Sequence, residues 1–334
     1  MEIPSSFIEI TEKVGKDINL VQGPGGNISF KKDGYMYIKA SGTRMSEAKK
    51  KNIFVKTNHK KIISALNNNE PEPLKNCWIQ NSLMRPSIET TMHALMPQKY
   101  VLHVHCVNTL SWLVQKNYQK KINPFMRGVN WVSVPYKKPG ICLSNEIKNI
   151  TAQSNADVIL LSNHGIVAGS DTPEGVLKKI SSISKKLYIS ELKKKEIVLE
   201  KFGNYLLSKN YKLPKYDYVH KIAFSKFHYL IATKGNLFPD QIVFLENGIV
   251  KINSPEELIN LSKTRIKNLP VVLIPNLGIL VPRTFNEVNE VTLYGLSMII
   301  SRLPQNASIN YLNKKDQNEL INWDLEKHRK KINI

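Results

Sequence analysis

Three histidines beside two short apolar runs constrain the fold of this chain most strongly. His103 and His105 alternate with apolar residues in the run at 101–105, and His164 follows the apolar run at 159–161. Side chains of a strand point alternately to its two faces, so an H-x-H pair places both imidazoles on one face. A third histidine at the end of another buried strand can converge on the same point.

Such a cluster indicates a metal site. Three neutral imidazoles with an open fourth coordination position are typical of a catalytic divalent metal, most often zinc. A protein core has little reason to bury two imidazoles side by side, because each polar edge needs a partner. Spacing alone leaves a second interpretation open, in which these residues are ordinary hydrogen-bonded core histidines.

Short motifs around the histidines occur in a recognisable order. They are GGNIS at 25–29, SG at 41–42, S-x-E at 87–89, H-x-H at 103–105 and NHG at 163–165. Each motif is common by itself, but together they resemble the class II aldolase/adducin family over roughly residues 5–205. The resemblance is strongest to the branch related to rhamnulose-1-phosphate aldolase and to aldolase–short-chain dehydrogenase fusions. No G-x-G-x-x-G follows in these 334 residues, so we expect no dehydrogenase part here.

The resemblance implies a fold and a reaction. The fold is α/β: a three-layer α/β/α domain with a central, mainly antiparallel sheet, and a small C-terminal α/β domain. The reaction is retro-aldol cleavage, or the reverse condensation, of a small sugar or ketose phosphate through a metal-stabilised enediolate. His103, His105 and His164 match the family's metal ligands, and Glu89 matches its acid/base carboxylate. The residues that match its phosphate-binding loops are Gly26, Asn27, Ser41, Gly42 and Ser87.

Two positions leave alternatives open. Ile88 stands where sugar-phosphate aldolases of the family often carry a second small hydroxyl residue, so it is open whether the substrate is phosphorylated. Glu89 favours a lyase, because the family's epimerases tend to carry aspartate here, but it also fits a dehydratase or a solvated glutamate in the first turn of a helix. The alternatives are therefore an epimerase or dehydratase of a sugar phosphate, and a non-catalytic adducin-like interaction module. The presence of all three histidines disfavours the module.

The net charge of +21 first suggests nucleic-acid binding. The lysines, however, are spread along the chain, and their densest group at 185–195 is interleaved with glutamate, as on a solvated helical face. A basic surface also attracts an anionic sugar phosphate. We therefore expect a small sugar or sugar-phosphate substrate and no nucleic-acid partner.

The compartment follows from what the chain lacks and from its cysteines. No apolar run reaches the length of a membrane span, and the N-terminus has no signal-peptide pattern. The three cysteines, Cys77, Cys106 and Cys142, form no motif, which favours free thiols in a reducing compartment. We expect a cytoplasmic protein with no membrane partner. The family resemblance adds a homo-oligomer, often a tetramer, in which a neighbour's residue can complete each site.

Periodicity and turn signals predict the element order. Helices are expected at 5–16, 59–67, 88–96, 108–116, 144–153, from Pro173 to about residue 208, and at 286–302. Strands are expected at 27–30, 35–39, 100–105, 132–134, 157–161, 165–168, 241–245, 271–275 and 278–282. A change of pattern near residues 208–216 predicts a catalytic domain over 1–210 and a small C-terminal α/β domain of unknown role over 211–334.

Overall fold

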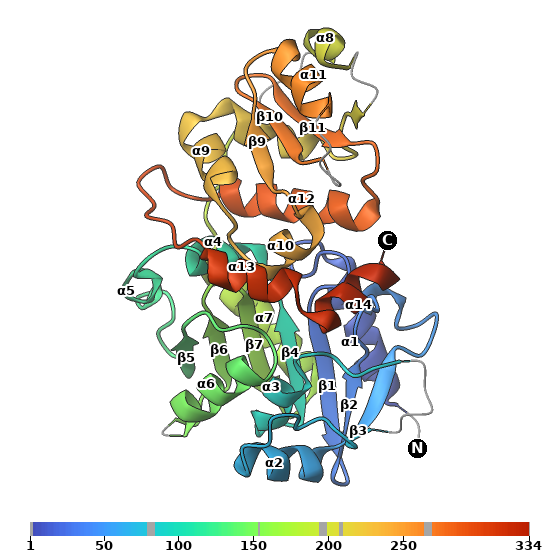
Figure 1. The fold of residues 1–334 in the computed structure, drawn as a ribbon. Coiled ribbons are helices and arrows are strands. Elements are labelled where there is room, and N and C mark those ends of the chain that lie inside the picture. The colour runs from blue at the N-terminus through green and yellow to red at the C-terminus, as the bar shows by residue number, and fades with distance from the viewer. Residues whose placement is uncertain are drawn as a thin grey trace. The chain divides into compact units, whose positions relative to one another are not determined.

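The computed structural model describes residues 3–78, 84–152, 154–193, 199–206, 210–263 and 269–333 of the chain (Figure 1). The chain forms two compact units. The first comprises Met1–Leu113, Asn117–Tyr188 and Trp323–Asn333, and the second comprises Val114–Lys116, Ile189–Asn322 and Ile334. Such units are groups of mutual contacts rather than independently folding parts, so the domain boundary after residue 210 stays a prediction.

The first unit contains a seven-stranded sheet. Its strands are β1 (Asn27–Lys32), β2 (Tyr35–Lys39), β3 (Phe54–Asn58), β4 (Tyr100–Val104), β5 (Trp131–Val134), β6 (Val158–Leu161) and β7 (Gly165–Ser170). Their spatial order is β3-β2-β1-β4-β7-β6-β5, and every neighbouring pair is antiparallel except β5 and β6. β4 lies at the centre, and all five of its residues are buried. The prediction of an α/β fold with a mainly antiparallel sheet is confirmed.

The β1–β2 hairpin shows how the sequence sets the register of this sheet. Asp33 and Gly34 both have positive φ, at 53° and 78°, which is the conformation that an Asp–Gly hairpin turn requires. The turn pairs Lys32 with Tyr35 and carries Ser29 opposite Ile38. The strands predicted at 27–30 and 35–39 are confirmed.

Helices cover both faces of this sheet, which completes the three layers (Figure 1). The helices are α1 (Ser5–Lys16), α2 (His59–Asn67), α3 (Thr90–Leu95), α4 (Val107–Leu113), α5 (Tyr118–Ile122), α6 (Ile141–Thr151), α7 (Pro173–Lys186) and α14 (Asp324–Ile332), with a 3-10 turn, η1, at Met45–Glu47. α3 and α6 bury Met92 and Leu143 against the face of the sheet that carries Val101. Because side chains alternate along β4, His103 points to this same face.

The long helix predicted from Pro173 to about residue 208 is wrong in its length. α7 ends at Lys186, because the chain passes at Ile189 into the second unit. Its buried apolar stripe, which includes Val176, Ile180 and Ile183, ends there as well. The part of the prediction at 194–198 and 207–209 lies outside the described residues.

The second unit has its own four-stranded sheet. Its strands are β8 (Tyr211–Lys212), β9 (Ile249–Lys251), β10 (Val271–Ile274) and β11 (Gly278–Pro282), in the order β8-β11-β10-β9. Its helices are α8 (Gly203–Leu206), α9 (Lys226–Lys234), α10 (Pro239–Leu245), α11 (Pro255–Lys263), α12 (Glu287–Ser301) and α13 (Lys314–Ile321), with the 3-10 helices η2 (Leu199–Phe202) and η3 (Asp217–Phe224). The predicted small C-terminal α/β part is therefore present.

One strand predicted in this unit is wrong. Residues 241–245 belong to the helix α10, which begins with Pro239 in its first turn. Every residue of α10 is buried, so the apolar run reflects burial on all sides. A short run of this kind does not distinguish a strand from a buried helix.

Candidate metal centre

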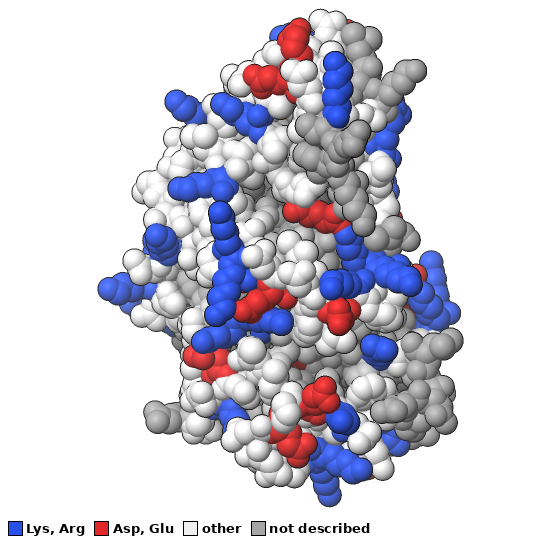
Figure 2. Space-filling view, viewed as in Figure 1, with Lys and Arg blue, Asp and Glu red and all other residues white. Residues whose placement is uncertain are grey.

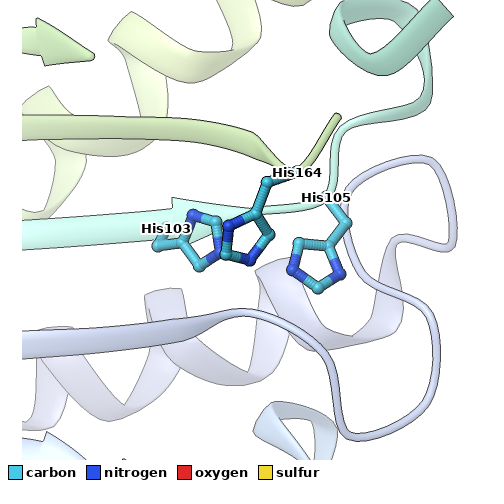
Figure 3. Close-up of side chains that lie close together, drawn as sticks. All are labelled: His103, His105 and His164. Atoms are coloured by element: carbon cyan, nitrogen blue, oxygen red, sulfur yellow. The ribbon is translucent and has the colours of Figure 1, made fainter. Parts of the chain in front are cut away.

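The three predicted histidines lie together in the first unit. His103 is on β4, His105 follows directly after it, and His164 lies in the turn between β6 and β7. Their ring centroids are 4.9–5.4 Å apart, and one ligand atom from each lies within 4.8 Å of the others. Figure 3 shows the three imidazoles gathered at one place. We call these residues the histidine cluster; all three are buried.

Two glycines of the predicted motifs make room for the cluster. A Cβ at Gly165 would lie 2.5 Å from the Val104 carbonyl oxygen and 3.1 Å from a ring carbon of His103. A Cβ at Gly26, where φ is +64°, would lie 2.9 Å from the His103 carbonyl oxygen. These approaches exclude any larger residue without a shift of the backbone. The glycines of the GGN and NHG motifs therefore allow these two loops to pack closely against the strand that carries the H-x-H pair.

The carboxylate of Glu89 faces the histidine cluster. Glu89 immediately precedes α3 and is buried; its Oε2 is 3.4 Å from Nε2 of His103 and its Oε1 is 3.2 Å from Nε2 of His164. Burial by itself opposes ionisation of this carboxyl group. Positive charge on the imidazoles of His103 and His164 outweighs it, with help from an Asn27 hydrogen bond, and lowers the pKa of Glu89 to about 2; with neutral imidazoles, a bound cation would have to supply that charge.

The donor set suits a divalent metal ion. Nδ1–H of His103 donates to the Ile166 carbonyl oxygen over 3.1 Å, which leaves the lone pair of Nε2 directed toward the Glu89 carboxylate. Two electron-rich atoms that face each other in this way require a proton or a cation between them. A divalent ion can supply this positive charge, and the three histidines are close enough to bind one ion together. Three neutral nitrogen ligands are a common set for catalytic zinc.

A chain of hydrogen bonds leads from Ser29 through His93 and Asn27 to Glu89. Asn27 Nδ2 donates to Glu89 Oε2 over 2.8 Å, so the Asn27 Oδ1 atom is left as an acceptor. His93 Nε2 contacts this Oδ1, and Ser29 Oγ lies 2.8 Å from His93 Nδ1. Burial lowers the pKa of His93 to about 3, so its ring is neutral. The only consistent pattern is that Ser29 donates to Nδ1 and Nε2–H donates to Asn27.

The residues predicted to bind phosphate separate into two groups. Ser41 and Ser87 line a cavity of about 830 Å³. Gly26 instead packs on His103, and Asn27 serves Glu89. The Gly42 carbonyl oxygen accepts a hydrogen bond from Asn333 in the C-terminal segment.

Ser87 connects the cavity with the carboxylate. Its Oγ accepts a hydrogen bond from the backbone N–H of Glu89 over 3.2 Å and another from Asn27 Nδ2 over 3.2 Å. The cavity therefore begins at the loop that positions Glu89.

Sequence analysis missed two contributors to this site. His93 could have been found, because it lies four residues after Glu89 and such spacing puts two residues on one side of a helix. The segment Trp323–Asn333 could not, because nothing in its composition indicates that the chain returns to the first unit. His328 of this segment, which carried no ligand-like spacing, lines the cavity.

Charged side chains of both signs lie on the face of the molecule that Figure 2 presents. Figure 2 shows lysine and arginine interspersed with aspartate and glutamate on the face it presents.

Among the described residues, no helix combines the length and the apolar character needed to cross a membrane.

Comparisons with known proteins identify a family for the first part of the chain. The family profile of the Class II Aldolase and Adducin N-terminal domain matches residues 6–189. A curated relative, the uncharacterized oxidoreductase YuxG of Bacillus subtilis, is 31% identical over 200 residues, which is 54% of this chain and 29% of YuxG. This chain therefore spans less than a third of that relative's length.

Solved structures also show similarity. The N-terminal Class II Aldolase domain of a conserved protein from Thermoplasma acidophilum is 24% identical, with a TM-score of 0.48, over 56% of this chain and 94% of that one. A sugar-phosphate aldolase from Thermotoga maritima is 16% identical, with a TM-score of 0.41, over 55% of this chain and 91% of that one.

Proposed function

The chain belongs to the class II aldolase and adducin family, and from this premise we propose that it is a divalent-metal-dependent lyase. It would cleave a small sugar or ketose phosphate by a retro-aldol reaction, or join the two fragments in the reverse direction. The observation that carries this proposal is the Glu89 carboxylate, which lies 3.2 and 3.4 Å from two of three buried, converging imidazoles.

The roles of the residues follow from their positions. His103, His105 and His164 would hold the metal, for which we propose zinc. A bound divalent ion supplies Lewis-acid stabilisation of the negative charge that develops on substrate oxygens when the carbon–carbon bond breaks. The imidazoles are neutral ligands, so they leave the charge of the ion undiminished.

Glu89 would move the proton. Asn27 holds Oε2 by a hydrogen bond, which leaves Oε1 free to act as the base. Oε1 would take up the proton of the substrate hydroxyl group as the carbon–carbon bond breaks, and would return it to the carbon freed by cleavage. The Asn27 hydrogen bond to Oε2 and the positive charge of the bound ion would keep this carboxyl group ionised at neutral pH, as a base must be. Ser87 and Asn27 fix the carboxylate in place, and Ser41 and Ser87 would contact the remainder of the substrate.

Assembly and location are further proposals. We propose a cytoplasmic homo-oligomer, in line with the family resemblance. Cys77, Cys106 and Cys142 are all free thiols in the structure, which supports a reducing compartment.

Metal content tests this function first. The protein, purified without chelator, should carry about one divalent ion per chain, and His103→Ala should lose both the ion and chelator-sensitive cleavage of ketose phosphates. His59→Ala is the matched control, because His59 is a partly buried histidine outside the cluster, bonded to the Ala94 carbonyl oxygen. No ion in the native protein, even after addition of excess metal and desalting, would refute the lyase proposal and favour an adducin-like interaction module.

The products distinguish the enzyme classes. Two carbonyl-containing fragments identify a lyase, an epimeric sugar identifies an epimerase, and loss of water identifies a dehydratase. Either of the last two, with metal retained, would replace the lyase assignment while leaving the metal site intact.

A further inference from the structure

The cavity beside Ser87 is larger than a small sugar phosphate requires. Its volume is about 830 Å³, and pockets of roughly 300–1,000 Å³ enclose drug-sized ligands. Ser41 and Ser87 both line it, and Ser87 accepts a hydrogen bond from the backbone N–H of Glu89. We call the part of this space that is lined by Ile141, Trp323 and Leu325 the remote cavity; Ile88, between Ser87 and Glu89 in the chain, lies where it meets the Glu89 loop.

One wall of the remote cavity comes from the C-terminal segment. Trp323 and Leu325 lie at the start of α14 and are both only partly buried, so their side chains reach the open space. Ile88 and Ile141 lie in the same cavity. Together these residues present an apolar surface that includes one indole ring.

This wall is fixed at both of its ends. A Cβ at Gly140, where φ is +91°, would lie 3.2 Å from the Trp323 ring, and Lys138 Nζ lies 4.6 Å from the centre of that ring. At the far end of the segment, Asn333 Nδ2 donates to the Gly42 carbonyl oxygen over 3.1 Å. The segment is thus seated in close contact with two glycine loops of the first unit.

Among the described residues, the basic groups around the remote cavity are exposed or only partly buried, His328 of its lining and Lys138 beside the Trp323 ring included. Among its described lining residues, the lysine and arginine side chains are exposed: Lys75 is paired with Glu72 over 3.7 Å, and both are about 70% exposed. Arg85 is exposed as well. Ile88 supplies an alkyl group at the position where a hydroxyl donor to an anion would help.

We propose that the substrate carries an apolar group of about the size of an aromatic ring at its end remote from the histidine cluster, bound by Ile88 and Trp323 in the remote cavity. This inference rests on the proposed function, since it assigns the other end of the substrate to the metal and Glu89. Within the small sugars and ketose phosphates of the proposed function, it favours as the best substrate a sugar that carries an alkyl or aryl substituent.

Three hydroxamates with different tails test this specificity. Acetohydroxamate, 3-phenylpropanohydroxamate and 3-phosphonopropanohydroxamate share a metal-binding head and end in a methyl, a phenyl or a phosphonate group. Their dissociation constants on metal-loaded full-length protein are measured by calorimetry. We expect the phenyl probe to bind about tenfold more tightly than acetohydroxamate, from burial of part of its ring, and the phosphonate probe to show no such gain.

Two variants connect this gain to the named residues. Trp323→Ala should abolish the advantage of the phenyl probe and leave acetohydroxamate unchanged, and Tyr188→Ala is a control at an exposed aromatic residue that does not line the cavity. Ile88→Ser removes apolar surface without altering Trp323. It should weaken the phenyl probe and strengthen the phosphonate probe, so the inference stays testable if Trp323→Ala misfolds.

The outcomes are distinguishable. A phosphonate probe that binds native protein more tightly than the phenyl probe overturns the inference and leaves the lyase proposal standing. Equal binding of the phenyl probe and acetohydroxamate does the same. If no hydroxamate binds the metal-loaded protein, the proposed metal site itself is refuted, and the inference with it.

Discussion

The two ends of the site are built in different ways. The histidine cluster comes from β4 and an adjacent turn of one sheet, and its geometry is fixed by strand alternation and by two glycines packed against His103. The remote cavity is closed by the segment Trp323–Asn333, which follows β4 by more than two hundred residues and His164 by 159. Under the proposed function the reaction would take place on the sheet, while the wall of the remote cavity is a short helix held by a few contacts.

This difference predicts a division of effects. Changes near the histidine cluster should act on the rate of the chemical step, because they alter groups that meet the reacting atoms. Changes in the C-terminal segment should act on substrate affinity. The following variants test whether the division holds.

Glu89→Gln should give the largest effect. It keeps the size of the side chain but removes the carboxylate that moves the proton, so kcat should fall by about a thousandfold. The histidine cluster stays intact, and metal content, measured by elemental analysis, should remain at the native level. Full turnover by this variant would show that a group other than Glu89 is the base and that the proton transfer does not take place at the histidine cluster.

His93→Ala should give an intermediate effect through Asn27. The neutral His93 ring donates to Asn27 Oδ1 and so fixes which side of the Asn27 amide faces Glu89. Loss of a comparable supporting hydrogen bond typically costs about 10–100-fold in activity, and we expect this loss in kcat with KM and metal content unchanged.

His93→Gln is the matched variant, because its amide can donate to the same oxygen. It should recover part of the lost kcat. If both variants instead lose stability and metal together, His93 is a core residue and does not position Glu89.

The sequence predicted these two ends unequally. Alternation in an apolar run was enough to predict that His103 and His105 share one face, and the ordered motifs led to Glu89. Those inferences depend on local sequence. The central strand β4 is fully buried, and burial fixes the register in which a strand pairs with its neighbours. The roles of these residues remain predictions, whereas the α/β fold with its mainly antiparallel sheet is confirmed.

What could not be predicted depends on tertiary contacts. The return of Trp323–Asn333 to the first unit leaves no local pattern, because the residues that receive it are glycines in distant loops. The prediction of a strand at 241–245 was wrong for a related reason. Burial on all sides removes the periodicity that separates a helix from a strand.

Asn333→Ala should give the smallest effect, and it tests the remote end of the comparison. The change removes the hydrogen bond to the Gly42 carbonyl oxygen, which is worth about 0.5–1.5 kcal/mol, and loosens the end of α14. Because Trp323 still packs on Gly140, the wall should remain in place most of the time. We expect KM to rise a few-fold at unchanged kcat, as measured by steady-state kinetics.

Asn322→Ala is the matched control for this change. Its amide bonds only within the exposed end of α13, to the Asn318 carbonyl oxygen, so KM should not move. A fall in kcat for Asn333→Ala, comparable with that of His93→Ala, would contradict the division between the two ends. It would mean that α14 helps to hold the Ser41–Gly42 loop in the geometry that the chemical step needs, and that the C-terminal segment belongs to the catalytic machinery.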